Sequence, residues 1–473
     1  MIRRLCCTFL LVCIGLGMSA RIALPDILSD YMVLQQHTQV KFWGTATPGS
    51  AVSVSPGWST QATAYTTESD GEGRWMILIP TPEASYQTHR ITISDETSSV
   101  TLNHILIGEV WFCSGQSNME MPLNGFFNCP ISGANHTIAT AGNHPAIRFA
   151  TIPKTAALTP QESCAGKWVE NNPANAQWFS ATAYHFATLL QSVLNVPVGI
   201  IHCSWGGSTV EGWLPEKILA QYPDVDLSQA GSKEGTEWLQ PMIMYNGMLK
   251  PLQNYTVRGF LWYQGESNVG RHDTYAERLA TMVSLWREEW ELGELPFYFV
   301  EIAPYEYGPG DWGAYLREAQ FRAQTLIPNS GMISTNDLVE SFESYNIHPR
   351  NKTEIGRRLA YIALSETYDV QGIRSGGPSY RSMDIQGDSI LLHFDRAEEG
   401  FSRMQEITGF EIAGEDRVFY PAGAEVNWNR EIIVSSPQVS KPVAVRYGFR
   451  NYLPGNIADH RGLPLYPFRT DNW

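Results

Sequence analysis

The sequence is poor in positive charge and in cysteine, and each shortage excludes certain classes of function. Lysine and arginine number 33 against 48 aspartate and glutamate residues, which gives a formal net charge of -15 at pH 7. Such a chain lacks the basic face that nucleic acids and anionic membranes require. The seven cysteines form no Cys-x-x-Cys pair and no Cys/His spacing typical of a zinc site. We therefore expect no nucleic-acid partner, no metal ion and no other cofactor.

Long apolar runs are also missing, and the one notable run lies at the N-terminus. Beyond it, no stretch reaches the roughly 20 apolar residues that cross a membrane. Arg3 and Arg4 precede an apolar segment at 5–17, and the small residues Ser19 and Ala20 follow. This pattern is typical of a secretory signal peptide and is too short for a membrane span. We predict that residues 1–20 are a signal peptide and that the protein is exported, either periplasmic or secreted.

Removal of the signal peptide leaves an even number of cysteines for an oxidising compartment. Cys113 and Cys203 lie in apolar segments typical of strands, so we expect them to be free thiols in the core. Cys129 and Cys164 are the pair expected to form a disulfide.

The length of 473 residues favours more than one domain. Residues 21–103 carry short β-type runs separated by Gly and Pro, which predicts a small β-sandwich domain. Residues 373–473 return to short strands and predict a second β-rich region. Between them, residues 104–372 alternate strand and helix, which predicts an α/β domain with a mostly parallel sheet flanked by helices. The expected strands are 102–112, 198–203, 257–263, 296–300 and 331–334, and the expected helices are 176–194, 273–290, 313–327 and 351–368.

Ser117 follows the first of these strands on a turn of small polar residues. A serine at the carboxyl end of a sheet strand is where α/β hydrolases place a nucleophile. Three further polar segments follow strands or precede the last helix, at 204–209, 264–268 and 345–352. They contain a histidine, a glycine turn and side-chain amides, the groups that a serine nucleophile needs as base and oxyanion donors. We expect all four segments to meet at one edge of the sheet.

Together these segments resemble the sialate O-acetylesterase family of the SGNH/GDSL hydrolase superfamily. The matching stretches are 114–119, 204–207, 262–268 and 347–352, with further similarity at 29–35 and 462–471. The resemblance implies an SGNH-type doubly wound fold and a carbohydrate O-acetylesterase without metal or cofactor. It implies Ser117 as nucleophile, His348 as general base and acid, and the Ser117 N–H, the Gly206 N–H and the Gln264 amide as oxyanion donors, with Asn268 in reserve. Its substrates would be O-acetylated sialic acids or, as the alternative, acetylated polysaccharides such as xylan and xyloglucan.

One departure from the family pattern concerns the acid that orients the histidine. The family usually has Asp two residues before the histidine, whereas this chain has Asn346. The superfamily often has Asp three residues before it, and here that residue is Tyr345. Three readings remain open: a Ser-His dyad, an amide or backbone carbonyl that orients His348, or a distant acid such as Asp337 or Glu266. Glu266 has an alternative role in holding its own loop in place.

Two other classes of function compete with this interpretation. The first is a non-catalytic carbohydrate-binding protein, since aromatic residues make up 12% of the chain and can stack on sugars. The second is a lipase or peptidase, but these carry Gly-x-Ser-x-Gly at the nucleophile. Here Met119 stands two residues after the serine. The sequence favours the acetylesterase over both.

Overall fold

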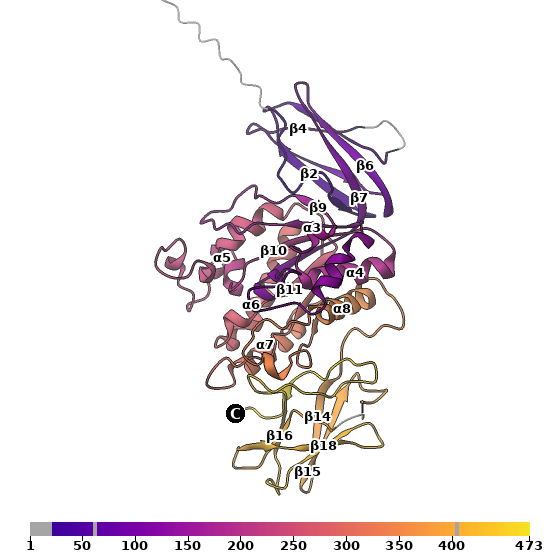
Figure 1. Ribbon diagram of the computed structural model, residues 1–473. Coiled ribbons are helices and arrows are strands. Elements are labelled where there is room, and N and C mark those ends of the chain that lie inside the picture. Colours follow the sequence, from indigo (N-terminus) through magenta and orange to yellow (C-terminus); the bar gives the residue numbers. More distant parts are fainter. Residues whose placement is uncertain (1–20, 60–63, 403–405) are drawn as a thin grey trace, which may run out of the picture.

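Figure 1 shows the computed structural model of the chain, which describes residues 21–59, 64–402 and 406–473. An N-terminal β-region, a central α/β domain and a C-terminal β-region follow one another along the chain (Figure 1). The predicted signal peptide, 1–20, lies outside the described residues. Within the described residues, no helix has both the length and the apolar character needed to cross a membrane.

The central sheet confirms the predicted α/β class. Its strand order is β13-β12-β11-β7-β10-β8-β9, and all neighbours are parallel except the short β9, which is antiparallel to β8. β7 lies in the middle, and its residues from Ile107 to Gly115 are buried because helices cover both faces. The strands are β7 (Ser99–Gly115), β8 (Ile147–Thr151), β9 (Trp168–Glu170), β10 (Val198–Ser204), β11 (Gly259–Tyr263), β12 (Phe297–Val300) and β13 (Ser330–Ile333).

Alternate residues of β7 face two different cores. Trp111 and Cys113 pack with α4 and α8 on one face, whereas Phe112 packs with α6 on the other. The larger helices are α4 (Ala181–Leu194), α6 (His272–Trp290), α7 (Trp312–Leu326) and α8 (Lys352–Ile362), and the short ones are α1 (Ser117–Glu120), α2 (Ala134–Ala139), α3 (Pro173–Ala176) and α5 (Glu216–Leu219).

Helix caps explain where the observed helices depart from the predicted ones. The predicted helix 176–194 is shorter in the structure: α3 ends at Ala176 and α4 begins at Ala181, because the Ser180 hydroxyl accepts the Ala183 N–H and starts a new helix there. The Asn351 side chain caps α8 in the same way by accepting the Glu354 N–H. α8 then continues as a π-helical turn at Ala363–Thr367.

The N-terminal β-region shares a strand with the central sheet. β7 pairs antiparallel with β6 from Ser99 to Ile107, and then parallel with β10 from Glu109 onward. The predicted domain boundary between residues 103 and 104 therefore falls inside one continuous strand. The other strands are β1 (Val33–Gln35), β2 (Gln39–Thr45), β3 (Ala51–Pro56), β4 (Tyr65–Glu68), β5 (Arg74–Pro80) and β6 (Ser85–Ser94).

Two four-stranded antiparallel sheets form the C-terminal β-region, with orders β14-β15-β19-β18 and β17-β16-β20-β21. Apolar side chains of both sheets, such as Ile390 and Val445, share one core, which agrees with the predicted sandwich-like region. The strands are β14 (Ser379–Gln386), β15 (Ser389–Asp395), β16 (Phe410–Ala413), β17 (Phe419–Pro421), β18 (Gly423–Val426), β19 (Ile432–Ser435), β20 (Ala444–Tyr447) and β21 (Phe468–Arg469).

The predicted disulfide between Cys129 and Cys164 is wrong. Both residues are free thiols, as are the buried Cys113 and Cys203, which agrees with the prediction for the latter two. The two half-buried cysteines belong to different parts of the domain. Cys164 packs against the larger core, and Cys129 packs against the core formed by α4 and α8.

Candidate active site

The turn after β7 holds Ser117 at the carboxyl edge of the central sheet. Gly115 ends the strand with φ +136°, and a Cβ there would lie 2.1 Å from the Tyr263 carbonyl oxygen of neighbouring β11. Only glycine fits this close approach. Gln116 is extended, and α1 begins directly at Ser117. The serine N–H therefore belongs to the first turn of a helix, where backbone donors have no intrahelical acceptor.

His348 reaches this serine from the loop before α8. Its Nε2 atom lies 2.8 Å from the Ser117 Oγ atom, a hydrogen-bonding distance for a nucleophile and its base. The Phe126 ring packs edge-on against the imidazole, with the ring centroids 5.3 Å apart. The structure thus brings together the two residues that the sequence selected, although 231 positions separate them.

The surroundings of His348 keep its imidazole neutral. Burial, together with the nearby Lys352 ammonium, lowers its pKa from 6.5 to about 4. An imidazolium in this place would lose solvation and face a like charge. At pH 7 the ring is therefore in the form that can accept the serine proton.

A buried polar network around Asn118 holds the turn that carries Ser117. Asn118 donates to a Glu266 carboxylate oxygen at 2.5 Å and to the Ile347 carbonyl at 3.0 Å. Its amide oxygen accepts from the Lys352 ammonium at 2.5 Å. Burial lowers the pKa of Lys352 to about 7 and raises that of Glu266. Through Asn118, this network fixes the position of Ser117 relative to the loop that carries His348.

The network assigns Glu266 a role other than orienting the histidine. Its carboxylate accepts from Asn118 and makes no hydrogen bond to His348 among the described residues. Asp337, the second distant acid considered, forms a two-pronged ion pair with Arg358, with both N–O distances at 2.7 Å. Neither acid contacts the imidazole. The structure does not bring either of them together with His348.

Asn346 lies close to the histidine but does not bond its ring. The amide oxygen of Asn346 accepts the backbone N–H of His348 at 3.0 Å and lies 3.3 Å from the Cys129 sulfur. That sulfur is itself 3.9 Å from the His348 Nδ1 atom. The atom beside the ring nitrogen thus belongs to Cys129, which the sequence analysis assigned to a disulfide. No spacing or motif in the sequence pointed to it.

The side chains of Gln264 and Asn268 hydrogen-bond to each other and to other groups of the fold. The Gln264 amide nitrogen donates to the Ser208 carbonyl at 3.0 Å and to the Asn268 side-chain oxygen at 2.7 Å. The Asn268 amide nitrogen donates to Glu211 at 3.0 Å. Both side chains are buried. The structure therefore does not present either amide as a free oxyanion donor, because its hydrogens already have acceptors within the fold.

Gly206 lies beside Ser117, as expected of segments that meet at one edge of the sheet, but its N–H already has a partner. A Cβ at Gly206 would lie 3.3 Å from the Ser117 Cβ atom. The Gly206 N–H donates to a Glu120 carboxylate oxygen at 2.5 Å, and the other oxygen of Glu120 pairs with Lys154 at 2.7 Å. Glu120 directly follows the segment 114–119, and the sequence motifs indicated no role for it. It competes with any oxyanion for this donor.

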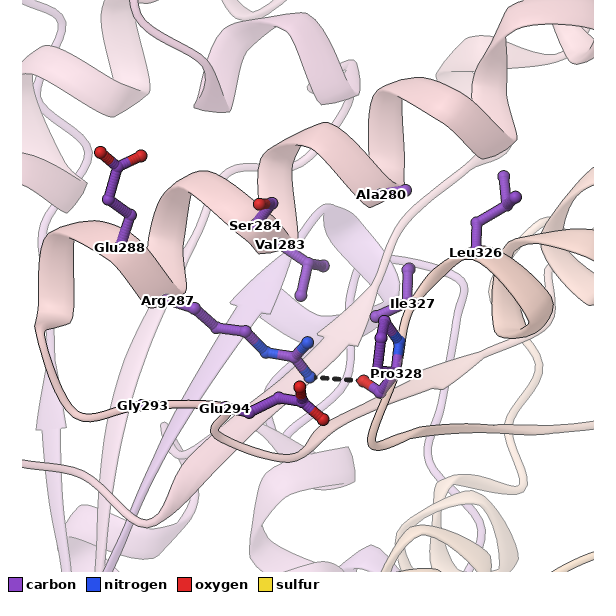
Figure 2. A pocket seen from close by; sticks show the side chains of 10 residues that line it. All are labelled: Ala280, Val283, Ser284, Arg287, Glu288, Gly293, Glu294, Leu326, Ile327 and Pro328. Carbon is purple, nitrogen blue, oxygen red and sulfur yellow. Dashed lines mark hydrogen bonds between the residues drawn. The ribbon is translucent and has the colours of Figure 1, made fainter.

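Figure 2 shows a hollow of about 420 Å³ that lies away from these residues. Arg287 of α6 extends across it and donates to the Pro328 carbonyl at 2.8 Å (Figure 2). It also donates to the carbonyls of Leu295 and Asn329, which precede β12 and β13. The hollow therefore lies at the amino ends of these strands, whereas Ser117 lies at the carboxyl end of β7. We assign the Arg287 contacts to loop anchoring.

Comparison with known proteins places the chain in a family. Residues 107–365, which include Ser117 and His348, match the family described as carbohydrate esterase, sialic acid-specific acetylesterase. The chain belongs to this family. It is therefore a carbohydrate esterase by descent, as the sequence motifs indicated. In the described ranges, no group of three or more His, Cys, Asp or Glu side chains is placed to hold a metal ion.

Relatives match most of the chain. The mouse sialate O-acetylesterase is 25% identical over 446 residues, covering 82% of this chain and 81% of the relative. The human sialate O-acetylesterase is 24% identical over 416 residues, covering 82% and 79%. A carbohydrate acetylesterase from Xanthomonas citri is similar in structure, with a TM-score of 0.84, 31% identity, and coverage of 96% of this chain and 100% of the other. The similarity thus includes both β-regions as well as the esterase domain.

Proposed function

We propose that the protein removes O-acetyl groups from sugar hydroxyls by a serine mechanism, with O-acetylated sialic acids as the substrate class. The observation that carries the mechanism is the 2.8 Å contact between the Ser117 hydroxyl and the neutral His348 imidazole. The same contact counts against a purely carbohydrate-binding protein, which has no need of an aligned nucleophile and base. The family membership and the mouse and human relatives support the sugar substrate.

The proposed reaction uses these two side chains in both halves. His348 takes the Ser117 proton at Nε2 while the serine oxygen attacks the acetyl carbonyl. The tetrahedral intermediate then expels the sugar alcohol, which receives that proton. Water attacks the resulting acetyl-serine by the same route, releases acetate and restores both residues.

We propose three groups as donors to the oxyanion of this intermediate. The Ser117 N–H lies at the start of α1, where donors point out of the helix. The Gly206 N–H becomes a donor once Glu120 withdraws from it. Gln116 is a new candidate, because Gly265 and Ser267 hold its side-chain oxygen and its amide nitrogen donates to no acceptor among the described residues. This assignment replaces Gln264 with Gln116.

Acetylated polysaccharide is the competing substrate. The Xanthomonas citri relative is described as a carbohydrate acetylesterase without mention of sialic acid, and it is the more similar at 31% identity. Trp238 lies directly against Gly207 of the Gly206-Gly207 turn and is 45% exposed. An exposed indole ring beside the Gly206-Gly207 turn is a surface on which a sugar can stack. Both substrates fit this arrangement, so a direct comparison is needed.

The test compares the wild-type protein with a Ser117→Ala variant. Acetate release is measured from acetylated sialoglycans, acetylated xylan and acetylated xyloglucan, with and without EDTA. We expect a preference for the sialoglycan, no effect of EDTA, and a loss of roughly 10⁴-fold in kcat for the variant. Circular dichroism confirms that the variant is folded. Residual activity within tenfold of wild type would mean that another residue is the nucleophile, and a preference for xylan or xyloglucan would establish the competing substrate.

We also propose that the protein works outside the cytoplasm. The proposal is supported by Arg3 and Arg4, the apolar run at 5–17 and the small residues before position 21. N-terminal sequencing of the protein recovered from the periplasm or the medium tests it. A first residue near position 21 would support cleavage there, and recovery only from the cytoplasm would contradict export.

A further inference from the structure

The Nδ1 nitrogen of His348 needs an acceptor if the ring is to act as a base. When Nε2 accepts the Ser117 proton, the neutral ring carries its own hydrogen on Nδ1. In Ser-His-Asp enzymes a carboxylate accepts this hydrogen and fixes the tautomer. Among the described residues, the atom within hydrogen-bonding reach of Nδ1 is the Cys129 sulfur, at 3.9 Å. A long contact of this kind suits the large sulfur atom, which is a weak acceptor.

Cys129 is held against the histidine by its own turn. Its N–H donates to the Phe126 carbonyl at 2.9 Å, and the Phe126 N–H donates back to the Cys129 carbonyl at 3.1 Å. The same turn brings the Phe126 ring against the imidazole. A ring and a thiol from one short segment therefore flank His348, and their positions are coupled by the two backbone hydrogen bonds.

The thiol hydrogen has an acceptor of its own. The Cys129 sulfur lies 3.3 Å from the Asn346 side-chain oxygen, which also accepts the His348 backbone N–H. The donors can therefore run in one direction: the Ser117 hydroxyl to Nε2, the Nδ1 hydrogen to sulfur, and the thiol to the Asn346 oxygen. In this arrangement every hydrogen has one acceptor. A ring with its hydrogen on Nε2 would break the chain, because it could no longer accept from Ser117.

The thiol supplies orientation but no charge. Burial raises the pKa of Cys129 above its usual value of 9, so the sulfur stays protonated at neutral pH. The charged groups that act on Cys129, on His348 or on the Lys352 near them are Lys352, Glu343 and Glu266. A carboxylate in place of the thiol would stabilise the imidazolium and raise the pKa of His348. A measurement of the pKa of His348 therefore distinguishes a neutral partner of Nδ1 from a charged one.

We propose that Cys129 is the positioning residue for His348 and takes the structural place of the triad acid. Its sulfur accepts the Nδ1 hydrogen, and Asn346 holds the thiol rather than the ring. This inference rests on the proposed function, in which Ser117 and His348 are the catalytic pair. It also assigns a role to Asn346 that differs from direct contact with the imidazole.

The test measures kcat and KM against pH for four variants on a small acetate ester. Cys129→Ala removes the acceptor, and we expect a loss of about tenfold or more in kcat with little change in KM. Cys129→Ser keeps an acceptor and should recover part of that loss. Cys129→Asp should move the acid midpoint of kcat/KM upward by at least about one pH unit. Cys164→Ala removes the other half-buried free thiol and should match wild type, which controls for loss of a cysteine.

The outcomes separate this inference from the proposed function. If Cys129→Ala stays within twofold of wild type, with the same acid midpoint, Cys129 does not position the histidine. An unchanged midpoint in folded Cys129→Asp would overturn the inference too. Should the Cys129→Asp variant fail to fold, the kcat values of Cys129→Ala and Cys129→Ser still test the inference. If Cys129 only fills space, the serine hydroxyl should not restore kcat. Full activity of Ser117→Ala, measured alongside, would instead refute the catalytic pair itself.

Discussion

Protonation of His348 should stop the reaction only at an unusually low pH. The imidazole must be neutral to accept the serine proton, so activity falls as pH drops through its pKa. Burial and Lys352 lower this pKa from 6.5 to about 4. We therefore expect kcat/KM to remain nearly constant from about pH 7 down to pH 5 and to fall by half near pH 4. This difference in pKa means that protonating the ring costs roughly 3 kcal/mol more in the protein than in water.

A Lys352→Met variant perturbs this pKa in a known direction. The positive charge of Lys352 disfavours the imidazolium, so its removal should move the acid midpoint of kcat/KM to higher pH. The substitution also deletes the hydrogen bond to Asn118 and leaves Glu266 buried without its nearby cation. Removing one member of a buried charge pair typically costs about 3–5 kcal/mol. The variant should thus combine a lower Tm with a higher midpoint.

The assay follows acetate release at each pH by a method that does not depend on a coloured leaving group. Circular dichroism at pH 4 shows whether the protein is still folded there, so that loss of the base is not confused with acid unfolding. An acid midpoint between 6.5 and 7 in folded wild-type protein would contradict this expectation, since it would mean that burial and Lys352 do not disfavour the imidazolium. A Lys352→Met midpoint at or below that of wild type would show that Lys352 does not act on His348.

Two further predictions concern residues around the nucleophile. Gln264→Ala leaves the buried Ser208 carbonyl without this donor and removes one of two partners from the Asn268 oxygen and from the Tyr275 hydroxyl. The free energy of unfolding should therefore fall by about 1–3 kcal/mol, while kcat of the folded protein drops less than tenfold. Thermal unfolding and kinetics together check this, and a 100-fold drop in kcat at unchanged Tm would restore Gln264 as an oxyanion donor. Gly115→Ala should give little folded protein, because φ is +136° and the new Cβ meets the Tyr263 carbonyl, whereas Gly142→Ala, with open space around it, should match wild type. Equal Tm values for the two alanine variants would contradict this account of the turn.

The parts of the site that lie on or directly after strands could be predicted from the sequence. Strand periodicity located β7, β10 and β11, and parallel strands bring their carboxyl ends to one edge. The segment 345–352 could be placed there because it comes at the start of the last predicted helix, 351–368. These rules depend only on local sequence and on the geometry of a parallel sheet. Ser117 and the segments that contain His348 and Gly206 were placed in this way, the family resemblance singled out the latter two residues, and the structure brings all three together.

Hydrogen-bond partners within the site could not be predicted, because several side chains can reach the same donor or acceptor and only the folded geometry decides which of them binds it. Gln264, Asn268 and Gln116 are all amides close to the turn, and nothing in their spacing tells which one is committed to the backbone. Cys129 and Cys164 were paired by elimination, although distance decides whether a disulfide forms. The boundary at residue 103 was placed where short strands give way to alternating strand and helix, yet β7 continues through both regions.

Replacing a carboxylate by a thiol beside the histidine changes the pH range in which the base is available. A histidine with a pKa near 7 would be only about 1% neutral at pH 5, whereas one with a pKa of about 4 is about 90% neutral there. The weaker base transfers protons more slowly, by about 30-fold if roughly half of the pKa difference appears in the rate. The gain in neutral base outweighs this loss below about pH 5.5, and the loss dominates above it. A neutral partner for Nδ1 is therefore an advantage to an esterase that works in acidic surroundings and a cost to one that works at pH 7. With its acid midpoint raised to near 7, the Cys129→Asp variant should accordingly be the better enzyme at neutral pH and the poorer one at pH 5.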